Sequence, residues 1–247
     1  MKLVAIMQPT FIPWIGYFAL LDAVDVFIFL DKVQFTKPSW QMRNFMRGPN
    51  GPVLISLNIQ RKPSKPLICD THLADNGFEV KLLKKIEMLI KTKQFSDHAM
   101  NILSEAFLTC EGKLSVLNRT IINKIAGAVG IRTPTHLESE LPVRETEKSM
   151  RILKITKHFN GSCYLSPIGS KDYLQVSNPF AKSDVSLRFF NYVHPSYPQG
   201  TEGFLSHMSA LEAFATVGPD RFLSLIRQGV NPPLAIQELS DGTNEKI

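Results

Sequence analysis

The fold is decided by residues 3–44, which read LVAIM-QPTFIPW-IGYFALLDAVD-VFIFLD-KVQFTKPSWQMRN. Two short apolar runs, 3–7 and 26–30, have the length and the flanking residues of buried strands. Between them, the apolar residues of 15–24 recur at helical spacing, which predicts an amphipathic helix. A strand, a helix and a strand within so few residues indicate a right-handed βαβ unit in a parallel sheet.

Two loops follow the strands of this unit, at residues 8–14 and 31–44. A parallel sheet binds its ligands in the crevice beside the carboxyl ends of its strands. Both loops carry polar and aromatic residues that a plain connection does not need, and Pro9 and Pro13 argue against helix in the first. We therefore expect the functional site at these two loops.

The rest of the chain alternates predicted helices with predicted strands, which favours an α/β fold over separate helical and sheet halves. Helical periodicity is present at 78–90, 96–108, 114–129, 147–159, 206–216 and 219–227. Extended segments are predicted at 52–60, 67–73, 135–141, 163–166 and 185–192. The fold we expect is a Rossmann-like, mostly parallel sheet with a helical middle segment.

The composition divides this one fold into successive parts. Residues 1–75 hold the N-terminal βαβ part, and 76–132 form a lysine-rich helical segment. Residues 133–230 form the C-terminal α/β part that completes the fold, and 231–247 are expected to be a tail. With 247 residues and 44% hydrophobic content, the chain can bury a substantial core.

Composition also argues against several classes of protein. No run approaches the ~20 apolar residues of a membrane span and no secretory cleavage site is present, so we expect a cytoplasmic protein. Three widely spaced cysteines argue against a disulfide framework, and the chain lacks CxxC and HExxH spacing, so neither a metal nor another cofactor is expected. Net charge +6 favours an anionic partner, but scattered lysines without a recognisable module argue against nucleic acid.

The first loop offers Gln8 and Trp14, and Tyr17 follows in the predicted helix. A proline-stiffened loop before a helix presents backbone N–H groups and a partial positive charge, which suit a phosphate group. The loop lacks the glycines of both standard nucleotide-binding fingerprints. Trp14 and Tyr17 are candidates to stack on a base or a sugar, and the alternative is that they pack in the core.

The second loop places a carboxylate at the end of a strand, with cations and amides close behind it. Its cations suit anionic oxygens, and its carboxylate and amides suit hydroxyl groups. This mixture is typical of a site for a phosphorylated or sugar ligand, and the alternative is a solvated loop with a few salt bridges. The candidates are Asp31, Gln34, Lys37, Trp40, Arg43 and Asn44.

Two later loops add further candidates. His194 follows a predicted strand and suits a general base near neutral pH, with Tyr197 and Gln199 after it. Tyr164 lies in a predicted strand, and Lys171 at the start of a short helix suits phosphate. The alternatives are a structural histidine and a surface lysine.

Four linked motifs resemble the WbqC-like family of bacterial proteins. They are QPTFIPWIGYF, DVFIFLDKVQFTKPSWQMRN, CYLSPIGSKDYL, and HPSYPQ followed by FLSHMSALEAF. The chain departs from the family pattern at Phe11, Pro38 and Met42, where Tyr, Arg and Asn are usual. Family members are encoded among genes for O-antigen, capsule and other surface carbohydrates, often beside sugar aminotransferases.

The resemblance implies a transferase of surface polysaccharide biosynthesis, such as that of the O-antigen of lipopolysaccharide. Its substrates would be a nucleotide-linked amino sugar and an activated acyl or aminoacyl donor, with the group added to the sugar nitrogen. Lys37 and Arg43 would hold the diphosphate, and His194 or Asp31 would accept the amine proton. The alternative is a non-catalytic accessory protein that binds a nucleotide sugar.

Overall fold

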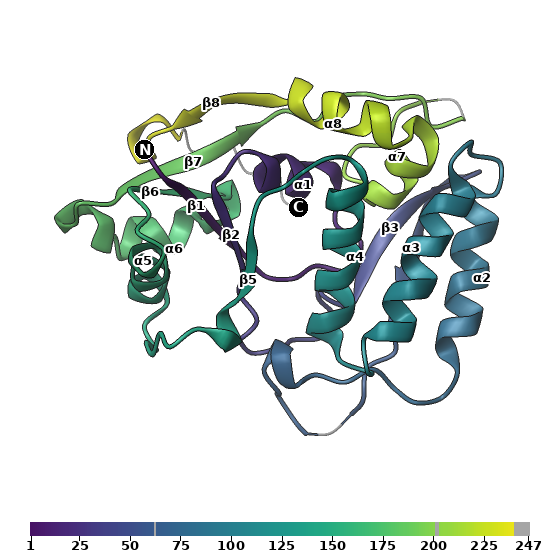
Figure 1. The fold of residues 1–247 in the computed structure, drawn as a ribbon, viewed down its shortest axis with the longest axis horizontal. Helices are drawn as coiled ribbons and strands as arrows, with labels where there is room; N and C mark the ends of the chain where they lie inside the picture. Colours follow the sequence, from purple (N-terminus) through teal and green to yellow (C-terminus); the bar gives the residue numbers. More distant parts are fainter. Residues whose placement is uncertain (62, 201–202, 240–247) are drawn as a thin grey trace.

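A six-stranded sheet runs through the centre of the fold (Figure 1). The computed structural model describes residues 1–61, 63–200 and 203–239. The strands, in spatial order, are β5 (Thr135–Leu137), β2 (Val26–Phe29), β1 (Leu3–Met7), β6 (Cys163–Ser166), β7 (Ser186–Tyr192) and β8 (Val230–Leu234). All neighbours are parallel except β7 and β8. The predicted α/β, mostly parallel sheet is confirmed.

The chain builds this sheet outward from β1 in two directions. It adds β2 and then β5 on one side, and later returns to add β6, β7 and β8 on the other. The two directions separate between β1 and β6, where Leu3 pairs with Cys163 and Val4 with Tyr164. In open α/β sheets, such a reversal leaves a crevice at the carboxyl ends of the two strands.

Helices cover both faces of the sheet. On one face lie α1 (Ile15–Asp22), α4 (Leu114–Ala128) and α8 (Pro219–Gln228), and on the other α5 (Lys148–His158) and α6 (Lys171–Val176). Adjacent strand residues alternate between the two cores, so that Phe27 packs in the first and Ile28 in the second.

Helix α1 is buried on all sides, and the prediction that it is amphipathic is wrong. All of its residues from Ile15 to Leu21 are buried. Tyr17 packs on Phe27 of the sheet at 5.4 Å between ring centroids, while Phe18 meets Phe222 of α8 edge to face at 5.7 Å. Helix α8, from the other end of the chain, therefore covers the face of α1 that the local sequence pattern predicts to be exposed to solvent.

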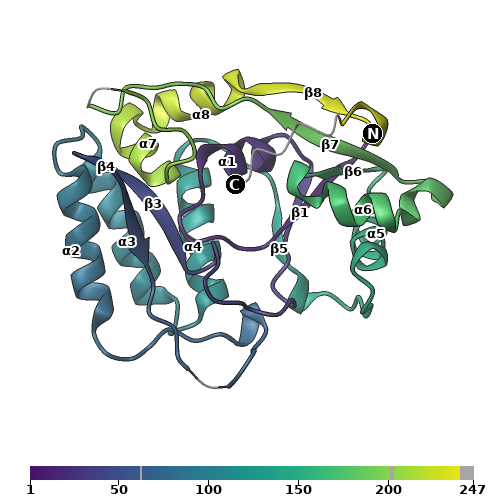
Figure 2. The ribbon, with the colours of Figure 1, turned by 180° about the vertical axis from the view of Figure 1, so that it is seen from behind.

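The predicted helical middle segment is confirmed as α2 (Phe78–Ile90), α3 (Ser96–Thr109) and α4, which lie side by side in Figure 1. Beside α2 lies a two-stranded antiparallel hairpin, β3 (Arg43–Gly48) and β4 (Gly51–Ser56), seen from behind in Figure 2. Strand β3 was not predicted, and residues 43 and 44, expected in a loop, lie in it. No helix of the described ranges is long and apolar enough to cross a membrane.

Two other segments differ from the sequence prediction. Residues 67–73 form a 3-10 turn at Ile68–Asp70 and not a strand. The predicted tail is wrong at its start, because β8 pairs with β7 at the sheet edge and Leu239 is buried. Pro232 and Pro233 are tolerated there, since an edge strand leaves backbone N–H positions unpaired. Residues 240–247 of that predicted tail lie outside the described residues.

The aromatic contact between α8 and α1 should carry much of the stability of this face. We expect Phe222→Ala to lower the free energy of unfolding by about 3–5 kcal/mol, because Phe222 is fully buried against Phe18. Urea unfolding would measure the loss. Leu223→Ala, at a half-buried position next to it, is the matched control and should have a smaller effect. Equal losses would contradict the assignment.

Candidate functional site

A cavity of about 580 Å³ opens where the chain reverses direction in the sheet, at the carboxyl ends of β1 and β6. Its walls come from the loop after β1, the β3–β4 hairpin with its approach, α5, the segment after β6, and the loop before α7 (Ala210–Val217). This volume lies within the usual range for small-molecule sites. A cavity thus lies beside the strand ends, where the sequence analysis expects the functional site.

The lining of this cavity is aromatic and rich in amides. Among the described lining residues, Lys148 is the only lysine or arginine, and none is Asp or Glu. The surroundings therefore favour an uncharged or anionic ligand with flat faces. The aromatic lining residues are Trp14, Tyr17, Trp40, Phe45, Tyr164 and Tyr173, and the amides are Gln8, Gln41 and Asn44.

Two buried asparagine amides hold the loop after β1 against its neighbours. Asn44 Nδ2 donates hydrogen bonds to the carbonyl oxygens of Phe11 at 3.2 Å and Ile12 at 2.7 Å. Asn118 Nδ2, from α4, donates to the carbonyls of Pro9 at 3.0 Å and Gln41 at 2.8 Å. The hairpin approach and the first loop are thereby fixed as one wall. Asn118 was missed by sequence reasoning, since nothing local marks it.

Tyr17 and Tyr164 line the cavity from its buried side. Their side chains are 2% and 1% exposed, so both also belong to the core. The Tyr17 hydroxyl donates to the Gln8 carbonyl at 3.1 Å, and the Tyr164 ring stacks on Phe180 at 5.5 Å. Burial raises the pKa of both phenols well above the ordinary value, so they remain protonated donors.

Lys148 stands at the first residue of α5 with its ammonium over an aromatic ring. Its Nζ lies 3.6 Å from the centroid of the Tyr173 ring, and burial lowers its pKa. The Tyr173 hydroxyl in turn shares hydrogen bonds with Tyr164 and Ser170. The position at a helix start was the only sequence signal for this lysine, which the sequence analysis did not single out.

The opposite wall is an aromatic stack of Trp14 with two histidines. The indole lies 5.7 Å from the His194 ring and nearly parallel to it, and 4.6 Å from the His207 ring. His207 lines the cavity, whereas His194 does not and stands behind Trp14. The backbone of His207 has φ 60, an uncommon conformation for a residue other than glycine, and its Nδ1 lies 2.9 Å from Ser206 Oγ.

Gly16 allows this stack to form. A Cβ atom at Gly16 would lie 2.1 Å from the Trp14 indole, far inside van der Waals contact. The ring folds back over the first turn of α1 and covers that glycine. The absence of a side chain at position 16 therefore leaves the space that the indole occupies.

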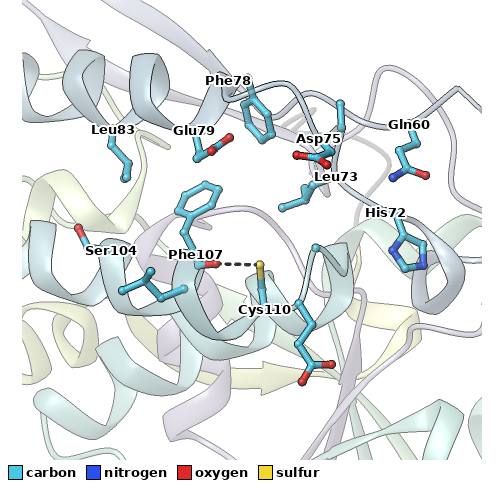
Figure 3. Close-up of a pocket in the computed structure, with 14 residues that line it drawn as sticks. Gln60, His72, Leu73, Asp75, Phe78, Glu79, Leu83, Ser104, Phe107 and Cys110 are labelled. Carbon is cyan, nitrogen blue, oxygen red and sulfur yellow. Dashed lines mark hydrogen bonds between the residues drawn. The ribbon is translucent and has the colours of Figure 1, made fainter.

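A second cavity, of about 630 Å³, lies between α2 and α3, and none of the sequence candidates lines it (Figure 3).

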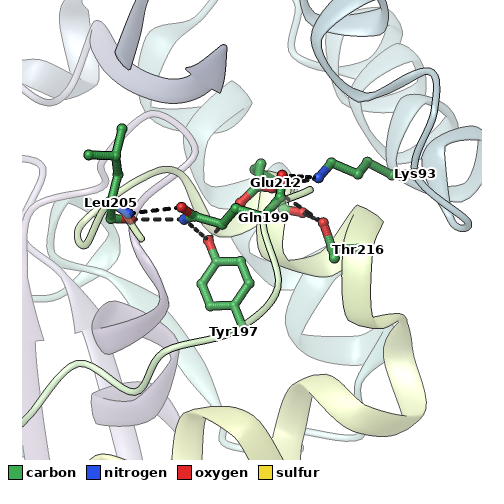
Figure 4. A network of polar contacts seen from close by, with 6 residues as sticks. All are labelled: Lys93, Tyr197, Gln199, Leu205, Glu212 and Thr216. Atoms are coloured by element: carbon green, nitrogen blue, oxygen red, sulfur yellow. Dashed lines mark hydrogen bonds and ion pairs between the residues drawn. The ribbon is translucent and has the colours of Figure 1, made fainter. Parts of the chain in front are cut away.

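Tyr197 and Gln199 do not line the first cavity but hold the loop that carries His207 (Figure 4). The Tyr197 hydroxyl donates to the buried Glu212 carboxylate at 2.7 Å, and Lys93 Nζ lies 3.3 Å from its other oxygen. Gln199 exchanges two hydrogen bonds with the Leu205 backbone, at 2.8 and 2.9 Å. Burial and the nearby Glu212 charge raise the pKa of Tyr197.

Asp31 is turned away from the cavity. It is fully buried and accepts hydrogen bonds from Ser139 N at 2.8 Å and Ser139 Oγ at 2.6 Å, which ties the end of β2 to the segment after β5. Burial raises its pKa against the opposing effect of these bonds. These hydrogen bonds give Asp31 a structural role.

Four more candidates lie outside the cavity lining. Gln34 forms a backbone bridge with Leu67, and Lys37 Nζ donates to the Ile59 carbonyl at 3.3 Å. The Arg43 guanidinium lies 5.9 Å from the Trp40 ring centroid, behind a residue that does line the cavity. The fourth is Lys171, at the start of α6. The structure therefore brings together Gln8, Trp14, Tyr17, Trp40, Asn44 and Tyr164.

The raised pKa of Asp31 gives a stability prediction with a definite sign. The raised pKa means that the Asp31 carboxyl binds a proton more tightly in the folded chain than in the unfolded chain. The free energy of unfolding therefore rises as the pH falls. The free energy of unfolding of the wild type should therefore rise relative to Asp31→Asn between about pH 7 and about pH 4, measured by urea unfolding.

The matched control is Asp184→Asn. The hydrogen bond from Lys157 lowers the pKa of this exposed carboxyl, so the stability that it contributes is lost as the pH falls. That loss lies below about pH 4, so between about pH 7 and about pH 4 the stability of the wild type relative to Asp184→Asn should change little. A pH trend of the same sign and size for both variants would contradict the role of Asp31.

One comparison with known proteins identifies a family. The model of the WbqC-like protein family matches residues 8–223 of the chain. An uncharacterized protein of Mycobacterium tuberculosis, Rv1507c, is 29% identical over 229 residues, which cover 89% of this chain and 96% of that protein. No solved structure matches the chain.

Among the described residues, no three His, Cys, Asp or Glu side chains are grouped so that they could hold a metal ion.

Proposed function

Since the chain belongs to the WbqC-like protein family, we propose that it transfers an acyl or aminoacyl group to a nucleotide-linked amino sugar for a bacterial surface polysaccharide. The observation that carries the proposal is the cavity at the sheet reversal, with its aromatic and amide lining and its single ammonium group. Indole rings suit sugar faces and nucleobases, amides suit hydroxyl groups, and an ammonium suits a diphosphate.

Lys148 is the proposed phosphate contact, in place of Lys37 and Arg43. It lines the cavity, whereas Lys37 is bonded to a backbone carbonyl and Arg43 lies behind Trp40. Partial desolvation strengthens the attraction between an ammonium and a phosphate oxygen, because less water screens the charges. The sugar and base would then lie along the wall of Trp14 and Trp40.

His207 is the proposed general base, in place of His194 and Asp31. In the transfer, the sugar nitrogen forms a bond to the acyl carbon, the bond from that carbon to its leaving group breaks, and the amine proton passes to the imidazole. His207 lines the cavity, and its backbone conformation and its contact with Ser206 fix the ring beside Trp14. An imidazole suits this step because it exchanges a proton near neutral pH.

A non-catalytic nucleotide-sugar-binding protein is the second candidate. The observation that favours it is the absence of Asp and Glu from the described lining, which leaves the cavity with few groups for acid–base chemistry. Both candidates predict ligand binding, and only the first predicts a new product when nucleotide sugar and activated donor are mixed. Mass spectrometry of such mixtures distinguishes them.

Replacing the cavity ammonium should weaken binding. We expect Lys148→Met to reduce affinity for uridine or thymidine diphosphate amino sugars by about tenfold or more in calorimetry, since a charge-assisted contact is lost. Lys171→Met, a lysine outside the lining, is the matched control and should bind as the wild type. Because burial lowers the pKa of Lys148, wild-type affinity should fall with rising pH below the ordinary lysine range, and the variant should not show this fall.

Replacing the proposed base should separate binding from turnover. We expect His207→Gln to lower turnover by about 10²–10⁴-fold while nucleotide-sugar affinity changes little. His194→Gln removes an imidazole of the same stack outside the lining, and it should retain more activity. If turnover persists in His207→Gln and is lost in His194→Gln, the general base is His194 and not His207.

A further inference from the structure

The cavity between α2 and α3 has an apolar base (Figure 3). Leu73 and Leu83 form part of it, together with Phe78 and Phe107, whose rings meet edge to face at 6.4 Å between centroids. Leu108 at its edge is 84% exposed, so the apolar surface continues out of the cavity. Large exposed apolar surface that continues from a groove is typical of a contact with another molecule.

Carboxylates from three segments surround this base. Asp75 precedes α2, Glu79 lies in its first turn, and Glu111 lies in the turn after α3. Within the described part of the chain, none of the three forms an ion pair, and the lining contains no lysine or arginine. In a chain of net charge +6, this rim is a locally negative region.

Backbone hydrogen bonds fix the walls before any ligand binds. Leu73 N donates to the Gly112 carbonyl and Ala74 N to the Asn58 carbonyl, both at 2.8 Å. Glu111 and Gly112 have φ 52 and 71, which makes the turn after α3 sharp and projects Glu111 at the rim. Walls that are already ordered lose little conformational entropy when a partner binds.

We propose that this groove docks a basic amphipathic segment of a partner protein. A large apolar side chain would rest on Phe78 and Phe107, and lysine or arginine side chains of the segment would reach the three carboxylates. Charge complementarity selects the basic partner, and the exposed Leu108 extends the contact beyond the size of a small ligand. The Cys110 thiol in the base is buried and donates to the Phe107 carbonyl at 3.3 Å, which suits a binding surface and not a reactive site.

The test uses the full chain and two helical probe peptides that share a leucine face and carry either lysine or glutamate on the other face. Fluorescence anisotropy should show that the wild type binds the lysine peptide at least about tenfold more tightly. Asp75→Lys with Glu79→Lys should invert this preference, because the rim charge changes sign. Leu108→Ser, at an exposed position, should weaken binding of the lysine peptide without unfolding the chain.

Glu87→Lys is the control, since it makes the same Glu-to-Lys charge reversal on α2 as Glu79→Lys, at an exposed position outside the groove. It should leave the preference unchanged. The proposal is overturned if Glu87→Lys weakens the lysine peptide as much as the rim variant does, or if the wild type binds both peptides equally. A wild-type dimer in sedimentation that the rim variant dissociates would assign the groove to a second copy of the chain and also overturn it.

Discussion

The site depends on two buried asparagine amides, Asn44 and Asn118. They donate hydrogen bonds to backbone carbonyls at a place where the chain forms no regular strand pairing. The loop after β1 cannot pair with a strand, because its prolines and its left-handed Ile12 (φ 41) interrupt extended structure. Asn44 from the hairpin and Asn118 from α4 donate instead to three of its carbonyls, those of Pro9, Phe11 and Ile12. Each amide supplies donors to two buried carbonyls, which would otherwise be left unsatisfied at about 1–3 kcal/mol each. The position of Trp14 and Trp40 follows from this arrangement.

Features encoded within a few residues of one another were predictable from the sequence. The strands β1, β2 and β6 are short apolar runs, and the middle helices keep their periodicity, so these elements were found nearly at their observed bounds. Helix α1 was misjudged because α8, about two hundred positions later, covers its second face. The strand β8 was missed because residues from 231 onward, which end in DGTNEKI, were predicted to be a tail. The two prolines of β8 are compatible with a strand because it pairs at the edge of the sheet, beside β7.

The residues of the candidate site also divide into those that the local sequence predicts and those that it does not. Gln8, Trp14 and Trp40 lie in loops that follow the first strands, so the strand-end rule located them. Lys148 at a helix start and His207 within the motif FLSHMSALEAF were not singled out, because neither local sequence shows that the side chain lines a cavity. The candidates Asp31, Tyr197 and Gln199 were sought for chemistry, but their polar groups are used by Ser139, Glu212 and Leu205 in holding the fold. Residue type alone does not separate these two uses of a polar side chain.

The contact between Gly16 and the Trp14 indole has a consequence for the evolution of the chain. Because the indole occupies the space of a side chain at position 16, the sizes of the two residues are mutually exclusive. A relative that carries alanine or a larger residue at 16 must either reduce the ring at 14 or turn it toward the cavity and shrink the space for ligand. Covariation of these two positions would therefore record changes in the ligand that different lineages accommodate.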